Sequence, residues 1–306
     1  MDRLEAMSIL VAAVEAGSFT AASRKLGVPL PTISRKVADL EAHLNARILM
    51  RTTRKLSLTD AGEAYLAASR KILEQVSEAE RAASGEYLVP RGHLSIAAPI
   101  VFGRLHVLPI VNAFLAAFPE IDIQLVLSDR NADLIGDHLD LAVRIGALRD
   151  SSMMAARVGS VRYVVCASPD FLGAHGVPAA PDDLMALPCV TFGATATASW
   201  AFASDGQAGR PIAVRSRLAV NTAEAAVDAA VAGVGIVRVL SYQVASALQK
   251  GRLRIVLADF EPAPLPVHLL HPAQTRPPLK LRRFIEFAAP RLKAALAGID
   301  RLLSPG

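Results

Sequence analysis

Apolar residues recur at three- and four-residue spacing along the first part of the chain, which is the pattern of amphipathic helices. The first predicted helix would bury one stripe made of Leu4, Met7, Val11 and Val14. Gly17 ends this helix, and Ser18 is placed to cap a second helix from Phe19 to Leu26. Gly27 would close that second helix in turn.

A third helix is predicted from about Pro31 to Leu44, because proline suits the first positions of a helix. Its inward stripe is spaced four, three and four residues apart and consists of Ile33, Val37, Leu40 and Leu44. On a helical wheel Arg35 and Asp39 then point most directly away from the stripe. The flanks of the helix carry Thr32, Ser34 and Lys36.

Short hydroxyls and an arginine near the start of a helix suit the major groove of DNA. Hydroxyls bond phosphates or base edges, and arginine can fork onto guanine. A solvated helix face explains the same residues equally well. The stretch Ser18–Leu44 alone leaves both interpretations open.

Two short β-type runs follow at 47–51 and 55–58, on either side of Thr52–Arg54. A small hairpin with Arg51 and Arg54 near its tip is typical of the wing of a winged helix, where cations contact backbone phosphate. This hairpin favours the DNA interpretation of the third helix.

A long helix is predicted from Thr59 to about Ala83, with an apolar seam at three- and four-residue spacing. We interpret the seam as a coiled-coil dimer contact formed by Tyr65, Ala68, Ile72, Val76 and Ala79. Packing against the chain's own body is the alternative. A dimer would hold two recognition helices about one DNA turn, or a multiple of it, apart.

Beyond the linker Glu86–Gly92 the pattern changes to strands that alternate with helices, which predicts an α/β body with mostly parallel sheets. The predicted strands are Leu94–Ala98, Ile121–Leu127, Asp140–Ile145, Val161–Ala167, Cys189–Phe192, Ile212–Val220, Gly235–Val239, Arg252–Val256 and Val267–Leu270. The predicted helices are Phe102–Phe118, Asn131–Asp137, Ala223–Ala232, Ser241–Gln249 and Leu279–Leu302.

Charge is concentrated at the N-terminal end. Residues 20–58 hold eight Lys and Arg against two acids, whereas the 306-residue chain as a whole carries a net charge of +5. A basic module on a nearly neutral body is typical of a polyanion-binding protein. The first residues lack the apolar core of a signal peptide, and the apolar stretch Ala219–Leu240 is interrupted by charges, so we expect a cytoplasmic protein without a membrane span.

Motifs for catalysis or metal binding are absent from the sequence. No G-x-S-x-G, H-E-x-x-H, Walker or dinucleotide glycine motif occurs, so we expect no enzyme, no catalytic residue and no cofactor. His268 and His271 have no ligand partners at metal spacing. Cys166 and Cys189 lie in apolar strands and are expected to be buried structural thiols, with a redox role left open.

Residues 1–60 resemble the DNA-binding domain of the LysR-type transcriptional regulators. The matching segments are Ser18–Ala22, Pro31–Val37, Leu40-Glu41 and Leu58–Gly62. Two positions depart from the family pattern: Leu30 stands where a Gln is frequent, and Met50 where a Phe is frequent. Losing the Gln removes an expected contact to a base edge, which leaves the bases that are read undetermined.

The resemblance implies a winged helix-turn-helix domain at 1–58, a linker dimerisation helix at 59–89 and an effector-binding domain at 90–306. The effector domain would have two α/β lobes like a type 2 periplasmic binding protein. Lobe I would span about 93–160 and 267–302, and lobe II about 161–266. The resemblance also implies a homodimer that assembles further into a homotetramer.

In this interpretation the protein is a regulator whose operator binding responds to a small molecule in the cleft between the lobes. The expected DNA contacts are Ser18, Thr20, Thr32, Ser34, Arg35, Lys36, Arg51 and Arg54. The expected effector contacts lie at the carboxyl ends of strands and in the loops after them: Pro99, Ile100, Val101, Phe102, Arg144, Gly146, Phe192, Trp200, Asn221 and Thr222. RNA polymerase is a further candidate partner. A ligand-independent DNA-binding regulator and a solute-binding protein are the alternatives.

Overall fold

The structure, a computed structural model, describes residues 1–51, 56–83, 89–130, 134, 136, 139–148, 153–193, 199–204, 207–208, 211–273 and 277–303. The chain divides into two compact units, Met1–Gly92 and His93–Gly306, and each unit is described by itself. The division falls three residues after the boundary at 89/90 that the sequence suggested.

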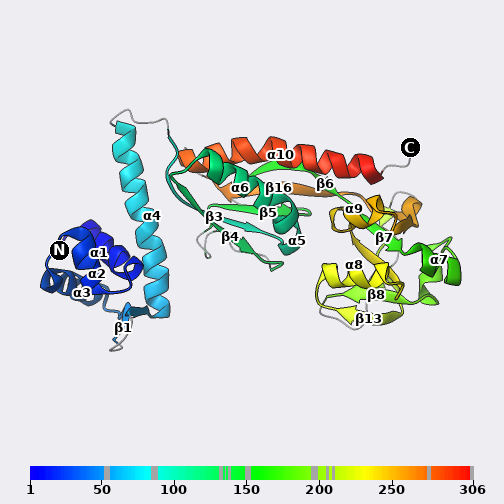
Figure 1. Cartoon of the computed structure of the whole chain (residues 1–306), viewed down its shortest axis with the longest axis horizontal. Helices are drawn as coiled ribbons and strands as arrows, with labels where there is room; N and C mark the ends of the chain where they lie inside the picture. Colours follow the sequence, from blue (N-terminus) through cyan, green and yellow to red (C-terminus); the bar gives the residue numbers. More distant parts are fainter. Residues whose placement is uncertain are drawn as a thin grey trace. The chain divides into compact units, whose positions relative to one another are not determined.

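The first unit is a small helical domain with a two-stranded hairpin (Figure 1). Its elements are α1 (Arg3–Glu15), α2 (Phe19–Leu26), α3 (Leu30–Leu44), β1 (Leu49–Arg51), β2 (Leu56–Leu58) and α4 (Asp60–Ala83). The strands β1 and β2 are antiparallel, with Leu49 opposite Leu58. The tip between them, which includes Arg54, lies outside the described residues.

The start of α2 and its end are fixed by the two residues that the sequence singled out. Ser18 has extended backbone, and its Oγ accepts a hydrogen bond of 3.1 Å from the Ala21 N–H, which would otherwise lack a helical partner. Gly27 adopts the left-handed conformation, with φ of 66°, that ends many helices. Both capping predictions are confirmed.

The core of the first unit lies between α1, α3, the hairpin and α4. The predicted stripe of α3 is confirmed, since Ile33, Val37 and Leu40 are buried and Leu44 packs against them. The stripe predicted for α1 is wrong in part, because Leu4 is exposed and the buried residues include Ala6, Ile9, Leu10 and Ala13. Helix α1 is apolar on almost every side, so several phases of the helical period fit its sequence equally well.

Contacts of Thr59, Gly62 and Glu41 hold the hairpin against α4 and α3. Thr59 Oγ1 donates to the Arg47 carbonyl at 2.7 Å and accepts from the Gly62 N–H at 3.0 Å, so it caps α4. A Cβ at Gly62 would lie 2.0 Å from the Ile48 carbonyl oxygen, so only glycine allows this close approach. Glu41 Oε1 accepts from the N–H groups of Ile48 and Leu49, which fixes β1 against α3.

The second unit alternates strands and helices, as predicted. Its first half contains β3 (Gly92–Ala98), α5 (Ile100–Phe102), the π-helical turn η1 (Gly103–Val107), α6 (Leu108–Ala117), β4 (Ile121–Leu127), β5 (Leu141–Ile145), β6 (Met153–Val161), β7 (Tyr163–Ala167), α7 (Pro169–His175), the 3₁₀ turn η2 (Pro181–Met185) and β8 (Cys189–Phe192). Its second half contains the short strands β9 (Ser199–Trp200), β10 (Ala203–Ser204), β11 (Gln207–Ala208) and β12 (Ile212–Ala213), then β13 (Ser216–Val220), α8 (Ala223–Val231), β14 (Ile236–Leu240), α9 (Ser241–Gln249), β15 (Arg254–Val256), the 3₁₀ turn η3 (Ala258–Phe260), β16 (Leu265–Pro272) and α10 (Leu279–Leu303). The helix predicted at Asn131–Asp137 falls mostly on residues outside the described ranges.

The strands form two five-stranded sheets, in the orders β4-β3-β5-β16-β6 and β13-β8-β14-β7-β15. We call the parts built on them lobe I and lobe II. The chain crosses into lobe II at Arg162 and returns before Leu265, because β6 ends in the first sheet and β7 begins the second. Both sheets are mixed: β3–β5, β8–β13 and β8–β14 are parallel, whereas β16 and β7 each pair antiparallel with both neighbours.

The expectation of mostly parallel sheets is therefore wrong. The apolar pattern predicts one strand over Val161–Ala167, but the chain forms β6 and β7 on either side of Arg162. Strand β16 then returns from lobe II and enters lobe I between β5 and β6, where it pairs antiparallel with both.

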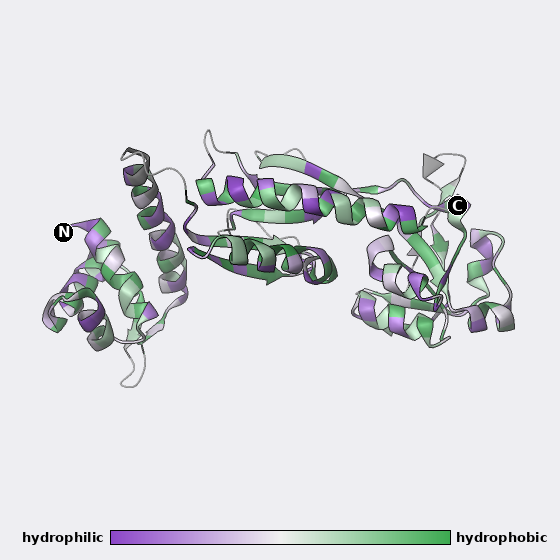
Figure 2. Ribbon diagram, turned by 45° about the horizontal axis from the view of Figure 1, so that its top comes forward, coloured by the Kyte–Doolittle hydropathy of each residue, from purple (hydrophilic) through white to green (hydrophobic). Residues whose placement is uncertain are grey.

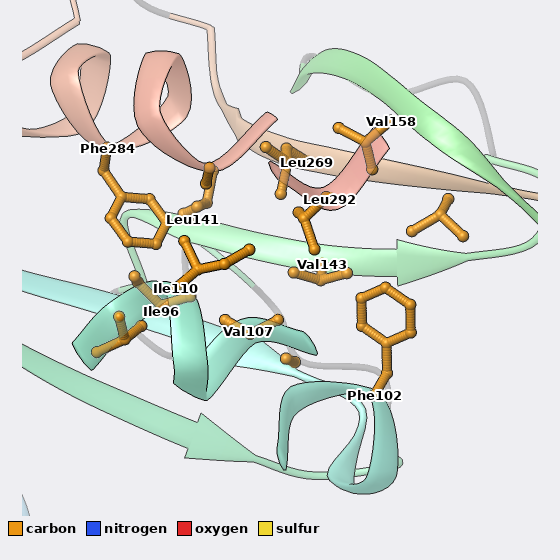
Figure 3. Packing of buried hydrophobic residues seen from close by; sticks show 14 of the residues in the cluster. Ile96, Phe102, Val107, Ile110, Leu141, Val143, Val158, Leu269, Phe284 and Leu292 are labelled. Atoms are coloured by element: carbon orange, nitrogen blue, oxygen red, sulfur yellow. The ribbon is translucent and has the colours of Figure 1, made fainter. Parts of the chain in front are cut away.

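The core of lobe I lies between its sheet and the helices α6 and α10 (Figure 1). Figure 3 shows Phe284 and Leu292 of α10 directed toward Leu141, Val143 and Leu269 of the sheet. The segment Ile100–Ala117 has the length and hydropathy of a membrane span, but Phe102, Val107, Val111 and Phe114 from it pack in this core. We therefore regard it as a core helix of lobe I.

Lobe II buries both faces of its sheet. Helices α8 and α9 cover one face, and α7 with the short strands β9 and β12 covers the other. In Figure 2 many strands of both lobes are mostly green, whereas purple and green alternate along α4 and α10. Central strands buried on both faces need apolar residues throughout, while a surface helix needs only one apolar stripe.

Candidate nucleic-acid interface and ligand pocket

The outer face of α3 carries the residues that the helical wheel placed there. Ser34, Arg35 and Asp39 are exposed, and Thr32 and Lys36 are half-buried on the flanks. No ion pair of Arg35 occurs among the residues that the structure describes, so its guanidinium has its five N–H donors available. The side chain has the position and the donors for a bidentate contact with guanine.

Other cations of this unit, among them Lys36 and Lys25, are engaged in ion pairs. Lys36 Nζ pairs with Glu5 of α1, and Lys25 Nζ lies 3.1 Å from Glu15. Exposed pairs of this kind contribute only about 0–1 kcal/mol, so a phosphate can replace the carboxylate at little cost. The sequence pattern did not reveal that Lys36 has a partner within the chain.

Ser18 and Thr20 stand at the start of α2, beside the turn that leads into α3. Thr20 is exposed, whereas Ser18 is half-buried and its oxygen caps α2. The Ser18 hydroxyl hydrogen can still be donated to a phosphate. Arg51 lies in β1 by its backbone, and Arg54 lies outside the described residues.

The apolar seam of α4 is divided between two environments. Tyr65 packs against the core formed by α1 and α3, and the neighbouring Leu66 is buried in it. Ile72 is 37% exposed, Ala79 is exposed, and Ala68 and Val76 are half-buried. Tyr65 thus serves the chain's own body, and only the part of the seam beyond it is available to a second subunit.

A pocket of about 150 Å³ lies in lobe I at the carboxyl ends of β3, β4 and β5. Its floor is apolar, and its polar lining comes from Ser128, Asp129, Arg130 and Arg144. Pro99 and Arg144 are the residues predicted from the sequence that line it. Carboxyl ends of neighbouring strands are where open α/β sheets bind ligands.

Asp129 is a member of this pocket that the sequence analysis missed. Its carboxylate accepts a hydrogen bond of 3.0 Å from the Ile100 N–H, at the start of α5. A free N–H group at the start of a helix favours an anion or a carbonyl of a ligand. The chain's own carboxylate occupies that position, so the Ile100 N–H is not available to a ligand in this arrangement.

Three of the predicted effector contacts are core residues. Val101 and Phe102 are buried in the core of lobe I, and Trp200 is buried in lobe II. Val101 and Phe102 lie on the side of the first helical turn that faces the core, whereas Ile100 before them is 39% exposed. The sequence placed all of them near the cleft because it could not tell which way each side chain points.

Phe192, Asn221 and Thr222 lie together at one edge of lobe II. Val220 pairs with Phe192 in the parallel strands β13 and β8, so Asn221 follows directly beside Phe192. Phe192 is 40% exposed, and Asn221 and Thr222 are exposed, although Thr222 Oγ1 also caps α8 by accepting from the Ala225 N–H at 3.3 Å. Gly146 ends β5 with φ of 109°, and its N–H donates to the Pro266 carbonyl.

The two lobes touch through residues that carried no motif. Arg104 of η1 pairs with Glu224 in the first turn of α8. Tyr242 of α9 packs edge-on against Phe102 at 5.2 Å between ring centroids and against His106 at 5.8 Å. The Arg104–Glu224 ion pair thereby connects lobe I with the start of α8, directly after Asn221 and Thr222.

An ion pair links the two crossings between the lobes. Arg162 at the first crossing lies 3.0 Å from Glu261, which precedes the second. Burial raises the pKa of the Glu261 carboxyl, and the nearby Arg162 guanidinium opposes that shift. Arg162 also donates to the Leu303 carbonyl at the end of α10.

Metal and thiol chemistry find no support in the described part of the chain. No group of three or more His, Cys, Asp or Glu is arranged there to hold a metal ion. Cys166 and Cys189 are buried, and burial raises the pKa of both thiols, which keeps them protonated and poorly nucleophilic.

The chain matches two family models. Residues 4–63 match the bacterial regulatory helix-turn-helix proteins of the LysR family, and residues 89–293 match the LysR substrate binding domain. The chain belongs to the LysR family of transcriptional regulators. It has the winged helix-turn-helix DNA-binding domain and the two-lobed α/β effector domain of that family.

Curated LysR-type relatives cover almost the whole chain. An HTH-type transcriptional regulator of Xanthomonas campestris is 34% identical over 289 residues, which are 93% of this chain and 84% of the relative. An HTH-type transcriptional repressor of Pseudomonas aeruginosa is 33% identical over 94% of this chain and 91% of its own length. Among solved structures, the LysR-type regulator CrgA of Neisseria meningitidis has a TM-score of 0.60 and 29% identity over 94% of this chain and 98% of its own.

Proposed function

We propose that this LysR-type regulator binds double-stranded DNA as a homodimer, with α3 in the major groove of each half-site. The observation that carries the proposal is the outer face of α3, where Arg35 is exposed between the hydroxyls of Thr32 and Ser34. In this arrangement Arg35 contacts a base edge, while Thr32 and Ser34 bond bases or phosphates. Ser18, Thr20 and Lys36, with Arg51 and Arg54 of the hairpin, contact the phosphate backbone.

The second subunit is contacted through α4 in this proposal. The exposed Ile72 and Ala79, with the half-buried Ala68 and Val76, supply the apolar seam, whereas Tyr65 remains in the core of its own subunit. Contacts between effector domains would then join two dimers into a tetramer, which is the assembly that the family resemblance implies.

A small effector occupies the pocket of lobe I and reaches toward lobe II. Pro99, Arg144, Ser128 and Arg130 line the pocket in lobe I. In this proposal the exposed residues Phe192, Asn221 and Thr222 of lobe II contribute the remaining contacts. A pocket of about 150 Å³ admits only a small molecule unless the lobes move. The effector would shift the equilibrium between two arrangements of the lobes, and thereby the spacing of the two recognition helices. The size of this shift is limited by the difference between the effector's affinities for the two arrangements.

Several finer assignments follow from this role. A transcriptional regulator of a bacterium acts where the chromosome is, so we place the protein in the cytoplasm. It performs no catalysis, since the proposed sites only bind DNA and a ligand. RNA polymerase is a candidate partner at promoters where the protein activates transcription.

The effector role is tested by screening small metabolites for a rise in the melting temperature of the full-length protein. Each hit is then added to a gel-shift assay with operator DNA. We expect at least one compound to raise the melting temperature and change operator affinity, and Arg144→Ala to remove both effects. Arg283→Ala, on the exposed side of α10, is the matched control. Hits that act equally on the Arg144 variant would contradict the proposed site.

A further inference from the structure

Leu30 is the first residue of α3, and its side chain is more exposed than those of the apolar residues that follow it along the helix. Ile33 and Val37, which follow it along the same side of the helix, are 0% and 3% exposed, whereas Leu30 is 42% exposed. The apolar stripe of α3 therefore continues one turn beyond the core of the domain. Leu30, the N-terminal member of this stripe, is partly exposed at the start of α3, next to the turn that follows α2.

The position of Leu30 makes it a part of the surface that would meet DNA. It lies one turn before Ser34 on the helix, and Thr32 and Arg35 follow within the first two turns. A recognition helix enters the major groove with its N-terminal residues nearest the base edges. A side chain that begins such a helix and projects from the domain is among the first to reach a base.

The chemistry of leucine limits what it can contact there. Its side chain neither donates nor accepts a hydrogen bond, so it cannot read the polar groups of guanine, cytosine or adenine. Among the four bases, only thymine presents an apolar group in the major groove, the methyl at C5. Placing Leu30 against any polar base edge would instead remove water from that edge without replacing its hydrogen bonds.

We infer that Leu30 is a specificity-determining residue that recognises a thymine in each operator half-site through its C5 methyl group. The inference rests on the proposed placement of α3 in the major groove. It adds an apolar contact to the polar ones of Thr32, Ser34 and Arg35, and it predicts one thymine in each half-site that uracil cannot replace without loss.

The test uses an operator isolated by selection with the full-length protein, in which each thymine is replaced in turn by uracil. Uracil keeps every hydrogen-bonding group of thymine and lacks only the methyl. Affinities are measured for the wild type, Leu30→Ala and Leu30→Gln. For the wild type we expect a loss of about fourfold at one symmetric position per half-site, the effect of one buried methyl-sized group.

In Leu30→Ala, thymine and uracil at that position should bind equally well, while sensitivity at other positions stays unchanged. The melting temperature and the affinity for non-specific DNA should stay close to the wild-type values, because Leu30 is 42% exposed and is not a member of the buried cluster of this unit. Two results would refute the role of Leu30 and leave DNA recognition by α3 intact. Either Leu30→Ala keeps the wild-type sensitivity to uracil, or the wild type binds its operator specifically but tolerates uracil at every position. If the wild type selects no specific operator, both fall together.

Discussion

At the scale of single residues, the proposed DNA-reading surface depends on side chains that form no ion pair within the described part of the protein. Arg35 forms no ion pair among the described residues, whereas Lys36 and Lys25 are paired with Glu5 and Glu15. An unpaired guanidinium loses no protein partner when it binds a base, so we expect Arg35 to contribute more to specificity than either lysine.

Arg35→Ala should lower the affinity for the operator by more than about tenfold and leave the affinity for non-specific DNA nearly unchanged, because a bidentate contact with guanine would be lost in each half-site. A gel-shift comparison of operator and scrambled DNA measures both quantities. Arg283→Ala, which removes an exposed arginine from α10, should behave like the wild type. Full specificity without the Arg35 side chain would refute its assignment to the base edge.

Gly62→Ala should destabilise the DNA-binding unit by about 1–3 kcal/mol, since the new Cβ would lie 2.0 Å from the Ile48 carbonyl oxygen and must push β1 away from α4. Gly298→Ala is a matched control, because Gly298 lies in α10 with open space around its Cβ position. Urea unfolding of each variant, followed by its operator affinity, checks the difference. Equal free energies of unfolding for the two variants would show that the backbone around Ile48 can accommodate a Cβ at position 62 without destabilising the unit.

The sequence predicted residue roles well where a local pattern fixes them. Ser18, Gly27 and the stripe of α3 follow from capping preferences and helical spacing, which act over a few residues. The roles of Asp129 and Tyr242 could not be predicted in this way, because each depends on a partner far away in the chain, Ile100 and Phe102 respectively. The side chains of Val101, Phe102 and Trp200, which were predicted as effector contacts, lie in the cores of the two lobes.

At the scale of elements, α4 has two tasks along its length. Its first turns close the DNA-binding unit through Gly62, Tyr65 and Leu66, and its later turns expose Ile72 and Ala79. The seam visible in the sequence combines these two parts, since burial against α1 and burial against a second subunit need the same apolar spacing.

Ile72→Asp should weaken the dimer by at least about a hundredfold, because two unpaired carboxylates would be buried in the proposed seam. Sedimentation at several protein concentrations measures the association. Gln75→Asp introduces the same charge at an exposed position of α4 and should leave the dimer intact. A dimer that tolerates aspartate at position 72 would place the subunit contact elsewhere.

Strand and helix positions in the second unit were mostly predictable, but their pairing was not. The sequence located β4, β8 and α9 correctly and missed the boundary at Arg162 that separates β6 from β7. Apolar periodicity indicates which residues form a strand. It does not indicate where the chain turns from one sheet into the other, as it does at Arg162. The mixed sheets follow from that one turn and from the return of β16.

At the scale of the whole molecule, the contact between the lobes contains a group sensitive to pH. His106 packs against Phe102 of its own lobe and against Tyr242 of lobe II, and its Nε2 has no hydrogen-bond partner in the described structure. Burial lowers the pKa of His106, and burial also lowers that of His268. The folded state thus favours neutral imidazoles.

A pKa that is lower in the folded state than in the unfolded state makes stability fall as the pH drops through the unfolded value of about 6.5. The melting temperature of the effector domain should therefore decrease from about pH 8 to about pH 5.5. In His106→Phe, which keeps a ring between Phe102 and Tyr242, the decrease should be smaller. His43→Phe, at an exposed position of α3, should retain the wild-type slope. An identical slope in the His106 variant would show that this imidazole protonates without cost.

The central claim is that this LysR-type protein reads specific DNA through α3 as a dimer. Selection of bound fragments from a random DNA library by the full-length protein, with Arg35→Ala in parallel, tests it most directly. We expect the wild type to enrich two-fold symmetric half-sites about one helical turn or a multiple of it apart, and Arg35→Ala not to enrich them. Enrichment of no common sequence by the wild type, or of the same symmetric sequence by Arg35→Ala, would contradict it.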